Sequence, residues 1–389
     1  MKPRFIAFYL PQFHPTPYND EWWGKGYTEW RSVTTARPLF KGHYQPHVPA
    51  DLGYYDLRLP IIREQQAELA REAGIEGFCY WHYWMGDGRR LLEMPFNEVL
   101  KSGKPDFPFC LAWANHNWTN KNWVKQSSLL KEKNIIEQKY SLEDYKAHFM
   151  TMLPAFRDSR YICVDGKPLF YIFMPEAIPN AREFIDTWQK LAKENGLAGI
   201  YFVGKRQNLN PSLVGKNGQF SIPRTDESAK LYHEILDMGF DAVNSRGYVR
   251  AEFLIRNSLK FAAQRFIRKY LRVQTLNRFN YEDIISNLFV EEDREENVFP
   301  TLIPNWDRSP RVGKDAVIYE NSTPELFGKS VRNALEIVKN KSQEHQIIFI
   351  QAWNEWGEGN HLEPDLKYGH GYLDVIKSSI LKYKNEWCV

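Results

Sequence analysis

The chain alternates between short continuous apolar runs and longer amphipathic stretches. The apolar runs lie at residues 5–10, 77–84, 107–115, 168–174, 199–205, 241–245, 299–306 and 347–356. Because hydrophobicity is continuous within each run rather than alternating, we expect strands that are covered on both faces, as in a parallel sheet. Helical periodicity is clearest at 59–74, 180–196 and 323–341, and the first two of these stretches end in glycine, which commonly stops a helix.

Eight alternations of strand and helix predict an α/β fold, a (β/α)8 TIM-type barrel, as one catalytic domain over residues 1–389. A doubly wound open sheet is the alternative, and the run at 241–245 is the weakest of the predicted strands. The first βα loop, residues 11–56, is too long for an ordinary connection and is rich in aromatic residues. We expect it to fold over the barrel mouth as a wall.

Polar and aromatic side chains gather where the predicted strands end, and in such barrels the functional site lies at the carboxyl ends of the strands. Aromatic residues make up 15% of the chain, and aromatic rings beside polar groups suit sugars, whose rings have apolar faces and polar edges. Three of the candidates, Asn115, Asn305 and Asp307, could equally cap local backbone. The candidate sugar-binding residues are Tyr9, Gln12, His14, Trp30, Tyr80, His82, Trp84, Trp113, Asn115, Trp118, Asn305, Trp306, Asp307, Trp353 and Asn354.

Two acids, Glu355 and Glu358, stand at the end of the last apolar run and just beyond it, in the stretch AWNEWGEG. Glu355 lies between Trp353 and Trp356, and Glu358 lies two residues after Trp356. In a continuing strand, residues three apart point to opposite faces, but Gly357 lets the chain turn. In a turn, side chains three apart approach to about 5–6 Å, near the ~5–5.5 Å between the carboxylates of retaining glycosidases. Aromatic walls that exclude water would raise the pKa of at least one acid. We therefore predict that Glu355 and Glu358 are the catalytic pair.

Several motifs also carry a family resemblance. They are, in chain order from residue 5 to residue 365, FYLPQFHP, HYQPHVPADLGYYDL, GFCYWHYW, LLEMP, LAWANHNWT, PNWDRSPR and AWNEWGEGNHLEPD. In this order they resemble the WbsX-type family of polysaccharide-locus proteins, which is similar to glycoside hydrolase family 99, the endo-α-mannosidases and endo-α-mannanases. The third-strand motif of the nearer relatives commonly reads W-A-N-E-N-W, and His116 stands here in place of that glutamate.

The resemblance implies a (β/α)8 enzyme that cleaves, or transfers across, a 1,2-trans glycosidic bond with retention, such as an α-mannoside or α-rhamnoside within a polysaccharide. In the route proposed for the hydrolase family, one carboxylate removes the proton of the sugar's own 2-OH. The oxygen then displaces the leaving group to give a 1,2-anhydro sugar, while the second carboxyl protonates the departing oxygen. By motif position, Glu355 would be the base and Glu358 the acid.

Two other functions remain open from the sequence. A glycosyltransferase of O-antigen, lipopolysaccharide or capsular polysaccharide biosynthesis is the role by which the WbsX-type family is often described. Against it, the chain has no D-x-D and no G-x-x-x-x-G-K-[ST] phosphate loop. A non-catalytic glycan-binding barrel would need aromatic walls but no paired acids. An oligo- or polysaccharide is the expected partner in all three cases.

Composition and motif spacing limit the partners, cofactors and location that we expect for the protein. The net charge of +3, from 51 basic and 48 acidic residues, gives no reason to expect nucleic acid as a partner. His14, His82 and His361 lack the spacing of a metal site, so we expect no metal and no cofactor. The N-terminal stretch lacks the apolar core of a signal peptide, and no apolar run reaches the ~18 residues of a membrane span. These features lead us to expect a soluble, cytoplasmic protein.

A basic amphipathic segment lies between the sixth and seventh predicted strands, at residues 246–280. We expect an inserted helix there, packing its apolar stripe on the barrel with its basic residues in water. The alternative is weak association with an anionic membrane surface through residues 250–273. The stripe consists of Ile255, Leu259, Ala262, Phe266, Tyr270 and Val273, and Arg265, Arg268, Lys269 and Arg272 lie largely off it.

Overall fold

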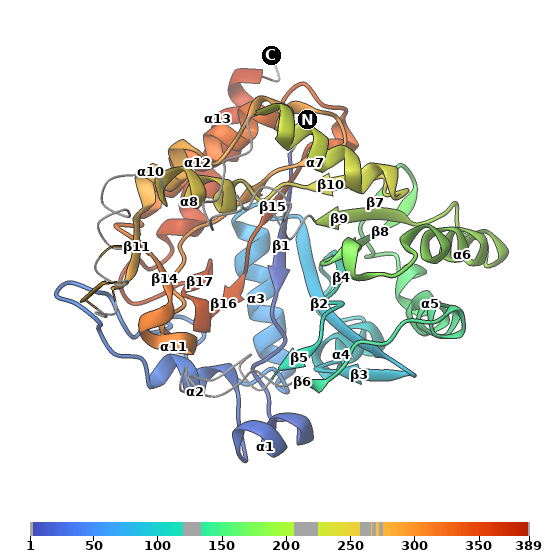
Figure 1. The fold of residues 1–389 in the computed structure, drawn as a ribbon, viewed down its shortest axis with the longest axis horizontal. Coiled ribbons are helices and arrows are strands. Elements are labelled where there is room, and N and C mark those ends of the chain that lie inside the picture. Colours follow the sequence, from blue (N-terminus) through green and yellow to red (C-terminus); the bar gives the residue numbers. More distant parts are fainter. Residues whose placement is uncertain are drawn as a thin grey trace.

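A closed parallel barrel forms the centre of the molecule (Figure 1). The structure, a computed structural model, describes residues 3–119, 134–205, 225–256, 266, 270–271 and 275–387. The barrel strands are β1 (Arg4–Tyr9), β2 (Gly77–Gly86), β4 (Phe109–Trp113), β8 (Lys167–Ile172), β9 (Tyr201–Lys205), β10 (Ala242–Asn244), β12 (Val298–Phe299), β13 (Thr301–Leu302) and β15 (Ile347–Ile350).

The strand order shows how the barrel closes. It runs β12-β10-β9-β8-β4-β2-β1-β15-β13, and along the chain only Pro300 separates its two ends, β12 and β13. Proline has no N–H to give to a ladder, so the seventh strand is split there. Its first half pairs with β10 and its second half with β15. The predicted (β/α)8 barrel is confirmed, and the weak sixth strand is the three-residue β10.

The helices that the sequence marks most clearly lie close to their predicted positions. N-cap side chains begin two of them, because Asn180 Oδ1 accepts a hydrogen bond from Glu183 N and Thr323 Oγ1 accepts one from Leu326 N. The clearly marked helices are α3 (Pro60–Glu72), α6 (Ala181–Glu194) and α12 (Pro324–Val338). The other helices around the barrel are α4 (Met94–Ser102), α5 (Leu142–Phe156), α7 (Thr225–Asp237), α8 (Gly247–Arg256), α10 (Tyr281–Ser286) and α13 (Gly371–Trp387).

An aromatic layer fills the interior of the barrel. The Phe8 ring of β1 stacks on Trp81 of β2 at 4.9 Å and on Phe349 of β15 at 5.2 Å. Tyr171 of β8 meets the same ring edge-on at 4.8 Å. Four strands therefore contribute rings to one packed layer, and the barrel is a core rather than a pore. Trp81 also borders the cavity above this layer, so the layer serves as its floor.

The long first loop lies against the segments that follow the last two barrel strands. It contains α1 (Pro17–Trp23) and α2 (Glu29–Thr34). The Trp30 ring lies 5.6 Å from that of Trp356, and Ala50 N donates a hydrogen bond to Pro364 O. The first loop thus packs against the barrel mouth, as the sequence led us to expect, and it lines a cavity beside Asn305 and Asp307.

Smaller elements complete the chain. They are β3 (Arg89–Leu91), β5 (Trp118–Thr119), β6 (Asn134–Ile136), β7 (Cys163–Val164), β11 (Asn277–Asn280), α11 (Ser309–Val312), β14 (Val317–Glu320), β16 (Asn354–Glu355), β17 (Asn360–His361) and the 3-10 turns η1 (Pro175–Ala177), η4 (Glu291–Arg294), η5 (Gly313–Asp315), η6 (Gln343–His345) and η7 (Trp356–Glu358). Of these, α11, β16 and η7 lie at the barrel mouth, where they carry the side chains described below.

The basic segment is described only in part. Its start is α8, which buries Tyr248 and Ala251 against a second core cluster around Phe279 and Tyr281. Ile255 packs on that cluster, whereas Phe266 and Tyr270 are exposed. The remaining stripe and basic positions, Leu259, Ala262, Val273, Arg265, Arg268, Lys269 and Arg272, lie outside the described residues. Among the helices of the described ranges, none combines the length and apolar character needed to cross a bilayer.

Candidate active site

The chain turns sharply after β15 and places both predicted acids at the barrel mouth. Glu355 ends the short strand β16, and Glu358 ends the 3-10 turn η7. Asn354 fixes this turn to the end of β1, because its side chain accepts from Leu10 N at 2.7 Å and donates to Leu10 O at 3.1 Å. In Figure 1, β1 in blue and β15 and β16 in red lie side by side at the centre.

Gly357 is required for a reason other than the turn itself. A Cβ atom at this position would lie 1.4 Å from Glu29 Oε1, far inside van der Waals contact. Glu29, from α2 of the first loop, is fully buried against the backbone between the two acids. The glycine therefore leaves room for a third carboxylate, which the sequence reading did not anticipate.

One guanidinium connects these three carboxylates. Arg311 donates from Nε to Glu29 Oε1 at 2.8 Å. Its Nη1 lies 3.1 Å from Glu355 Oε1 and 2.8 Å from Glu358 Oε1. Arg308 adds a second cation, with Nε 3.0 Å from the same Glu358 oxygen. Both arginines follow the seventh strand, so the site combines segments from the beginning and the end of the chain.

The shared contact limits the distance between the two acids. Since both oxygens contact the same nitrogen, at 3.1 Å and 2.8 Å, they are at most about 6 Å apart. This upper bound allows the ~5–5.5 Å of retaining glycosidases and lies below the ~6.5–9.5 Å of inverting ones. The side chains of Glu355 and Glu358 are 13% and 11% exposed, so both face the cavity without being open to bulk solvent.

The two acids differ in their electrostatic surroundings. Burial, and then the charge of Glu358, raise the pKa of Glu355 to about 7. Burial would also raise the pKa of Glu358, but Arg308 and Arg311 outweigh it and hold that pKa below its ordinary value. A single proton shared by the pair therefore lies on Glu355 near neutral pH. The predicted rise in the pKa of one acid is confirmed.

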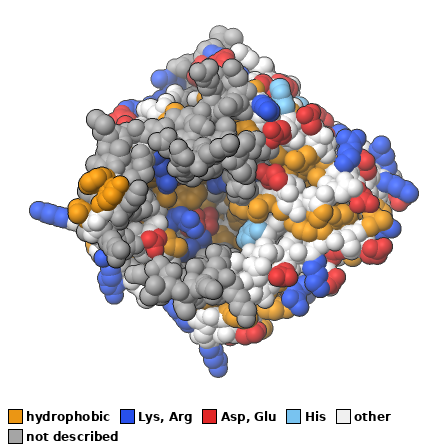
Figure 2. Space-filling model, in the orientation of Figure 1, with side chains coloured by type: hydrophobic (Ala, Val, Ile, Leu, Met, Phe, Trp, Pro, Cys, Tyr) orange, Lys and Arg blue, Asp and Glu red, His pale blue; other side chains and the backbone are white. Residues whose placement is uncertain are grey.

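A cavity of about 490 Å³ opens in front of the pair, at the carboxyl ends of the strands. Its aromatic surface comes from Trp81, Tyr83, Phe173 and Trp306. Figure 2 shows the mouth as a hollow in which basic and acidic side chains meet. Among the lining residues are the acids Glu355 and Glu358, four basic residues (Lys205, Arg246, Arg308 and Arg311), and His116 and Gln351. The size and the mixture of rings and polar groups suit one or two sugar units.

Of the predicted sugar-binding residues, Trp306 lines this cavity together with the acids. Asn305, Trp306 and Asp307 line an adjacent cavity of about 270 Å³. The others do not border the main cavity, and all are buried. They are Tyr9, Gln12, His14, Trp30, Tyr80, His82, Trp84, Trp113, Asn115, Trp118, Trp353 and Asn354.

Strand alternation explains why the predicted residues of β2, namely Tyr80, His82 and Trp84, all point away from the cavity. Tyr80 packs on Phe96 of α4, and His82 Nε2 lies 2.8 Å from His148 Nε2 of α5. The alternate residues of the strand, Trp81 and Tyr83, point the other way and line the cavity.

The predicted polar residues that could be caps are held by protein groups. Asn115 accepts from Met174 N at 2.8 Å and donates to Met174 O at 2.7 Å, which ties two strand ends together. Asp307 accepts from His43 and from Gln45, each at 2.6 Å, and so holds the first loop. Among the acids beyond the pair, Glu363 accepts from Tyr55, Gln66 and Trp356 and plays the same kind of structural role.

One cluster within the described residues has donor atoms suited to a metal, namely His47, His361 and Asp365, with their ligand atoms within 4.8 Å of one another. His361 Nδ1 lies 3.0 Å from Glu363 O, which makes it the donor and leaves Nε2 as the acceptor. His47 Nδ1 then donates to that nitrogen at 2.9 Å. Hydrogen bonding between two neutral imidazoles satisfies this arrangement, and it borders the adjacent cavity rather than the acid pair.

The sequence reading missed the basic residues of the cavity. Arg308 and Arg311 stand inside the motif PNWDRSPR, directly after the seventh strand, and Lys205 is the last residue of the fifth. The rule that strand ends carry the site would have found all three, had it been applied to cations as well as to aromatic residues and acids. No feature of the sequence around Glu29 indicated that this residue would join the site.

Comparison with known protein families identifies the family of this chain. The family described as glycosyltransferase WbsX matches residues 5–376. The chain belongs to this family. A WbsX relative, the uncharacterised protein WxcX of Xanthomonas campestris, is 32% identical over 381 residues, which are 97% of this chain and 49% of WxcX. The chain therefore spans about half the length of the curated relative it matches.

Solved structures show the same fold at low identity. A glycoside hydrolase-like protein superposes with a TM-score of 0.55 at 15% identity, over 97% of this WbsX chain and 94% of its own. The family 99 endo-α-mannosidase of Bacteroides thetaiotaomicron, in complex with bis-tris propane, gives 0.55 at 14% identity, over 98% and 97% of the two chains. At these identities the likeness shows the barrel fold alone.

Proposed function

We propose that this WbsX protein cleaves, or transfers across, a 1,2-trans glycosidic bond with retention, and that Glu355 and Glu358 are its catalytic pair. The observation that carries the proposal is the convergence of the two carboxylates on one nitrogen of Arg311, within about 6 Å of each other, in the lining of a sugar-sized cavity. The barrel shared with family 99 endo-α-mannosidases supports the same reaction class.

The proton distribution supports a division of roles within the pair. Glu355 holds the proton near neutral pH, which suits it to protonate the departing oxygen. Glu358 is kept ionised by Arg308 and Arg311, which suits it to take the proton of the sugar's 2-OH. The 2-oxygen forms a bond to C1 as the bond from C1 to the leaving oxygen breaks. Water then attacks C1 and opens the resulting 1,2-anhydro ring; Glu355 takes a proton from this water, and Glu358 returns its proton to O2. This order of roles is the reverse of the one that motif position implies.

The reaction fixes the stereochemistry of the substrate. Attack by O2 requires O2 and the leaving group to lie on opposite faces of the ring, so α-mannosides and α-rhamnosides fit and α-glucosides do not. Clean turnover of an α-glucoside would contradict 2-OH participation. Turnover of an α-mannoside or α-rhamnoside with retained configuration at C1, followed by NMR of the first-formed product, is the expected result.

Transfer from an activated donor is the second candidate, because the family is described as a glycosyltransferase. The same pair would then act on a sugar nucleotide and an acceptor glycan. Incubation with UDP- and GDP-sugars, alone and with α-mannoside or α-rhamnoside oligosaccharides, separates the two. Release of nucleotide only in the presence of acceptor identifies a transferase, and cleavage of the oligosaccharide without donor identifies a hydrolase.

A further inference from the structure

The cavity has a basic side that faces the acid pair. Lys205 is the last residue of β9, and Arg246 lies two residues beyond the end of β10. These strands are neighbours in register, with Asn244 opposite Lys205. Both cations line the same cavity as Glu355 and Glu358.

Lys205 is an unusual residue to find in such a place. It is 3% exposed, and its ammonium lies 3.8 Å from the centre of the Phe173 ring. Burial, followed by the nearby charge of Arg246, lowers the pKa of Lys205 well below its usual value. Within the described ranges, no carboxylate lies within 4.0 Å of this ammonium. A buried cation without a carboxylate at contact distance is costly, so the position is expected to serve a bound group.

The other charges of the cavity do not supply that group. Glu355 and Glu358 are held by Arg311, and Glu358 also by Arg308. Burial lowers the pKa of His116, which leaves this ring neutral at pH 7. None of these lining groups therefore gives the Lys205 ammonium a carboxylate at contact distance. A neutral glycan offers this ammonium no counter-charge, whereas an anionic substituent does.

We propose that the sugar recognised at this site carries an anionic substituent, a carboxylate or a phosphate, bound by Lys205 with Arg246. The inference rests on the proposed function, because it names the substrate class of the same cavity. Phe173 and Trp81 meet edge to face at 5.3 Å and give the cavity apolar surface beside Lys205, which lies over the Phe173 ring. A sugar in this cavity would have the acids among its neighbours and Lys205 with Arg246 as the groups that meet its anionic substituent.

Binding of uncleavable probes tests this without requiring turnover. We would use S-linked methyl and disaccharide glycosides in matched pairs, α-mannuronate against α-mannose and β-glucuronate against β-glucose, together with mannose 6-phosphate against mannose. Calorimetry with the full chain should show the charged member of a pair binding about 10- to 100-fold more tightly, as expected for a hydrogen bond to a charged group. Preference for the uronates identifies a carboxylate, and preference for the phosphate alone identifies a phosphate.

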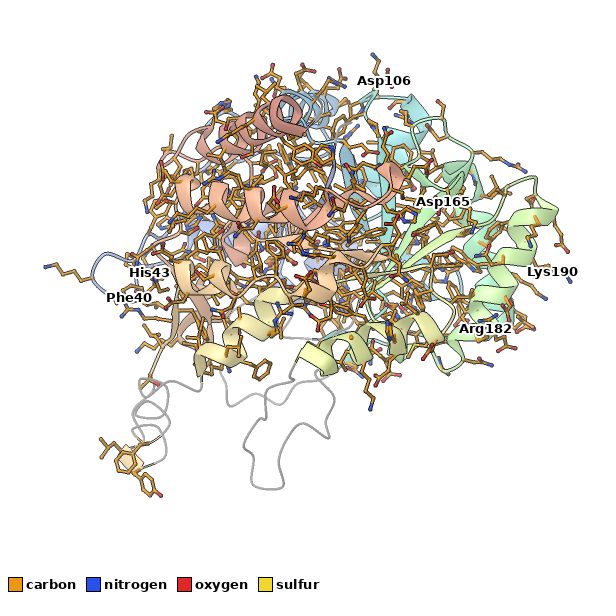
Figure 3. The ribbon with its side chains drawn as sticks, turned by 90° about the horizontal axis from the view of Figure 1, so that it is seen from above. Phe40, His43, Asp106, Asp165, Arg182 and Lys190 are labelled. Carbon is orange, nitrogen blue, oxygen red and sulfur yellow. The ribbon has the colours of Figure 1, made fainter. Side chains whose placement is uncertain are left out.

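A matched pair of variants assigns the effect to Lys205. Lys205→Met keeps the length of the side chain and should abolish the preference for each charged probe over its neutral partner. It should also raise the urea midpoint of unfolding, because it removes a buried cation. Lys190→Met is the control, since Lys190 lies on α6 at the outer edge of the molecule, 77% exposed (Figure 3). It should change neither quantity.

The outcomes distinguish this inference from the function on which it rests. Charged probes that bind no more tightly than neutral ones, including no detectable binding of either in the millimolar range, overturn the inference. So does a charge preference that survives in Lys205→Met. Charge-selective binding combined with no cleavage of the O-linked counterparts would uphold the anion site and count against the hydrolytic proposal alone.

Discussion

Replacing each acid of the pair separately tests the division of roles. A group that protonates the leaving oxygen matters only when that oxygen leaves poorly, whereas the base that acts on the 2-OH is needed whatever leaves. Glu355→Gln should therefore lose about 10²–10⁴-fold on a natural glycosidic bond and keep most of its rate on a glycosyl fluoride or dinitrophenyl glycoside. Glu358→Gln should be poor on both substrates.

The raised pKa of Glu355 also predicts how activity depends on pH. With a pKa raised to about 7, Glu355 is about half protonated at pH 7 and about 1% protonated at pH 9. Because the proposed role of Glu355 requires its protonated form, activity on the natural bond should be present below pH 7 and should be lost as the pH rises through 7, by about tenfold per unit. Activity on the dinitrophenyl glycoside should not follow this fall.

Single-turnover release of dinitrophenol, compared with cleavage of the natural bond from pH 5 to pH 9, measures both effects. Glu194→Gln on α6, whose side chain is 53% exposed, is the matched control and should behave as the unaltered protein. If Glu358→Gln instead keeps its rate on the activated substrate, the order of roles implied by motif position is correct. Equal losses by both variants on that substrate would refute the assignment of separate roles.

Three further predictions follow from contacts around the pair. Gly357→Ala should displace the Glu29 carboxylate, since the new Cβ would lie 1.4 Å from its oxygen, and should lower both the thermal midpoint and kcat; retained activity would show that this third acid is dispensable. Arg308→Met removes the leading cause of the lowered pKa of Glu358, so the acidic limb of the pH–rate profile should move to higher pH, and an unmoved limb would contradict this role. Asn354→Ala breaks hydrogen bonds to the backbone at the end of β1 and should cost about 1–3 kcal/mol of unfolding free energy in urea titrations, against less than about 0.5 kcal/mol at an exposed site.

The sequence predicted the barrel because parallel strands covered on both faces leave continuous apolar runs, which are readable without any contact information. The same continuity concealed which residues face the cavity. In β2 nearly every position from Phe78 to Trp84 is aromatic, so no alternation separates Trp81, which points into the barrel, from His82, which packs on α5.

The acid pair could be predicted because its members are three residues apart and follow a strand. Glu29 and Arg311 could not, since they are 282 residues apart and meet only when the barrel closes. The glycine between the acids was read as a turn residue, although its η7 turn leaves it at an ordinary backbone angle and its role is to admit the Glu29 carboxylate. A sequence pattern predicts the geometry of residues that are close together in the chain. The sharing of one arginine by distant carboxylates is determined only by the complete fold.

The pairing of Arg311 with three carboxylates also has a consequence for the synthesis and folding of the protein. The carboxylate partners of Arg311 lie near the two ends of the chain, at Glu29 and at Glu355 and Glu358. At ribosomal speeds of ~5–20 residues per second, the first acid waits about 15–65 seconds for the other two. Throughout that time β1 has no β15 to pair with and its edge is open. A nascent chain therefore has no assembled site until β15 and η7 have been made, and the exposed first strand is the part that a chaperone would be expected to protect until then.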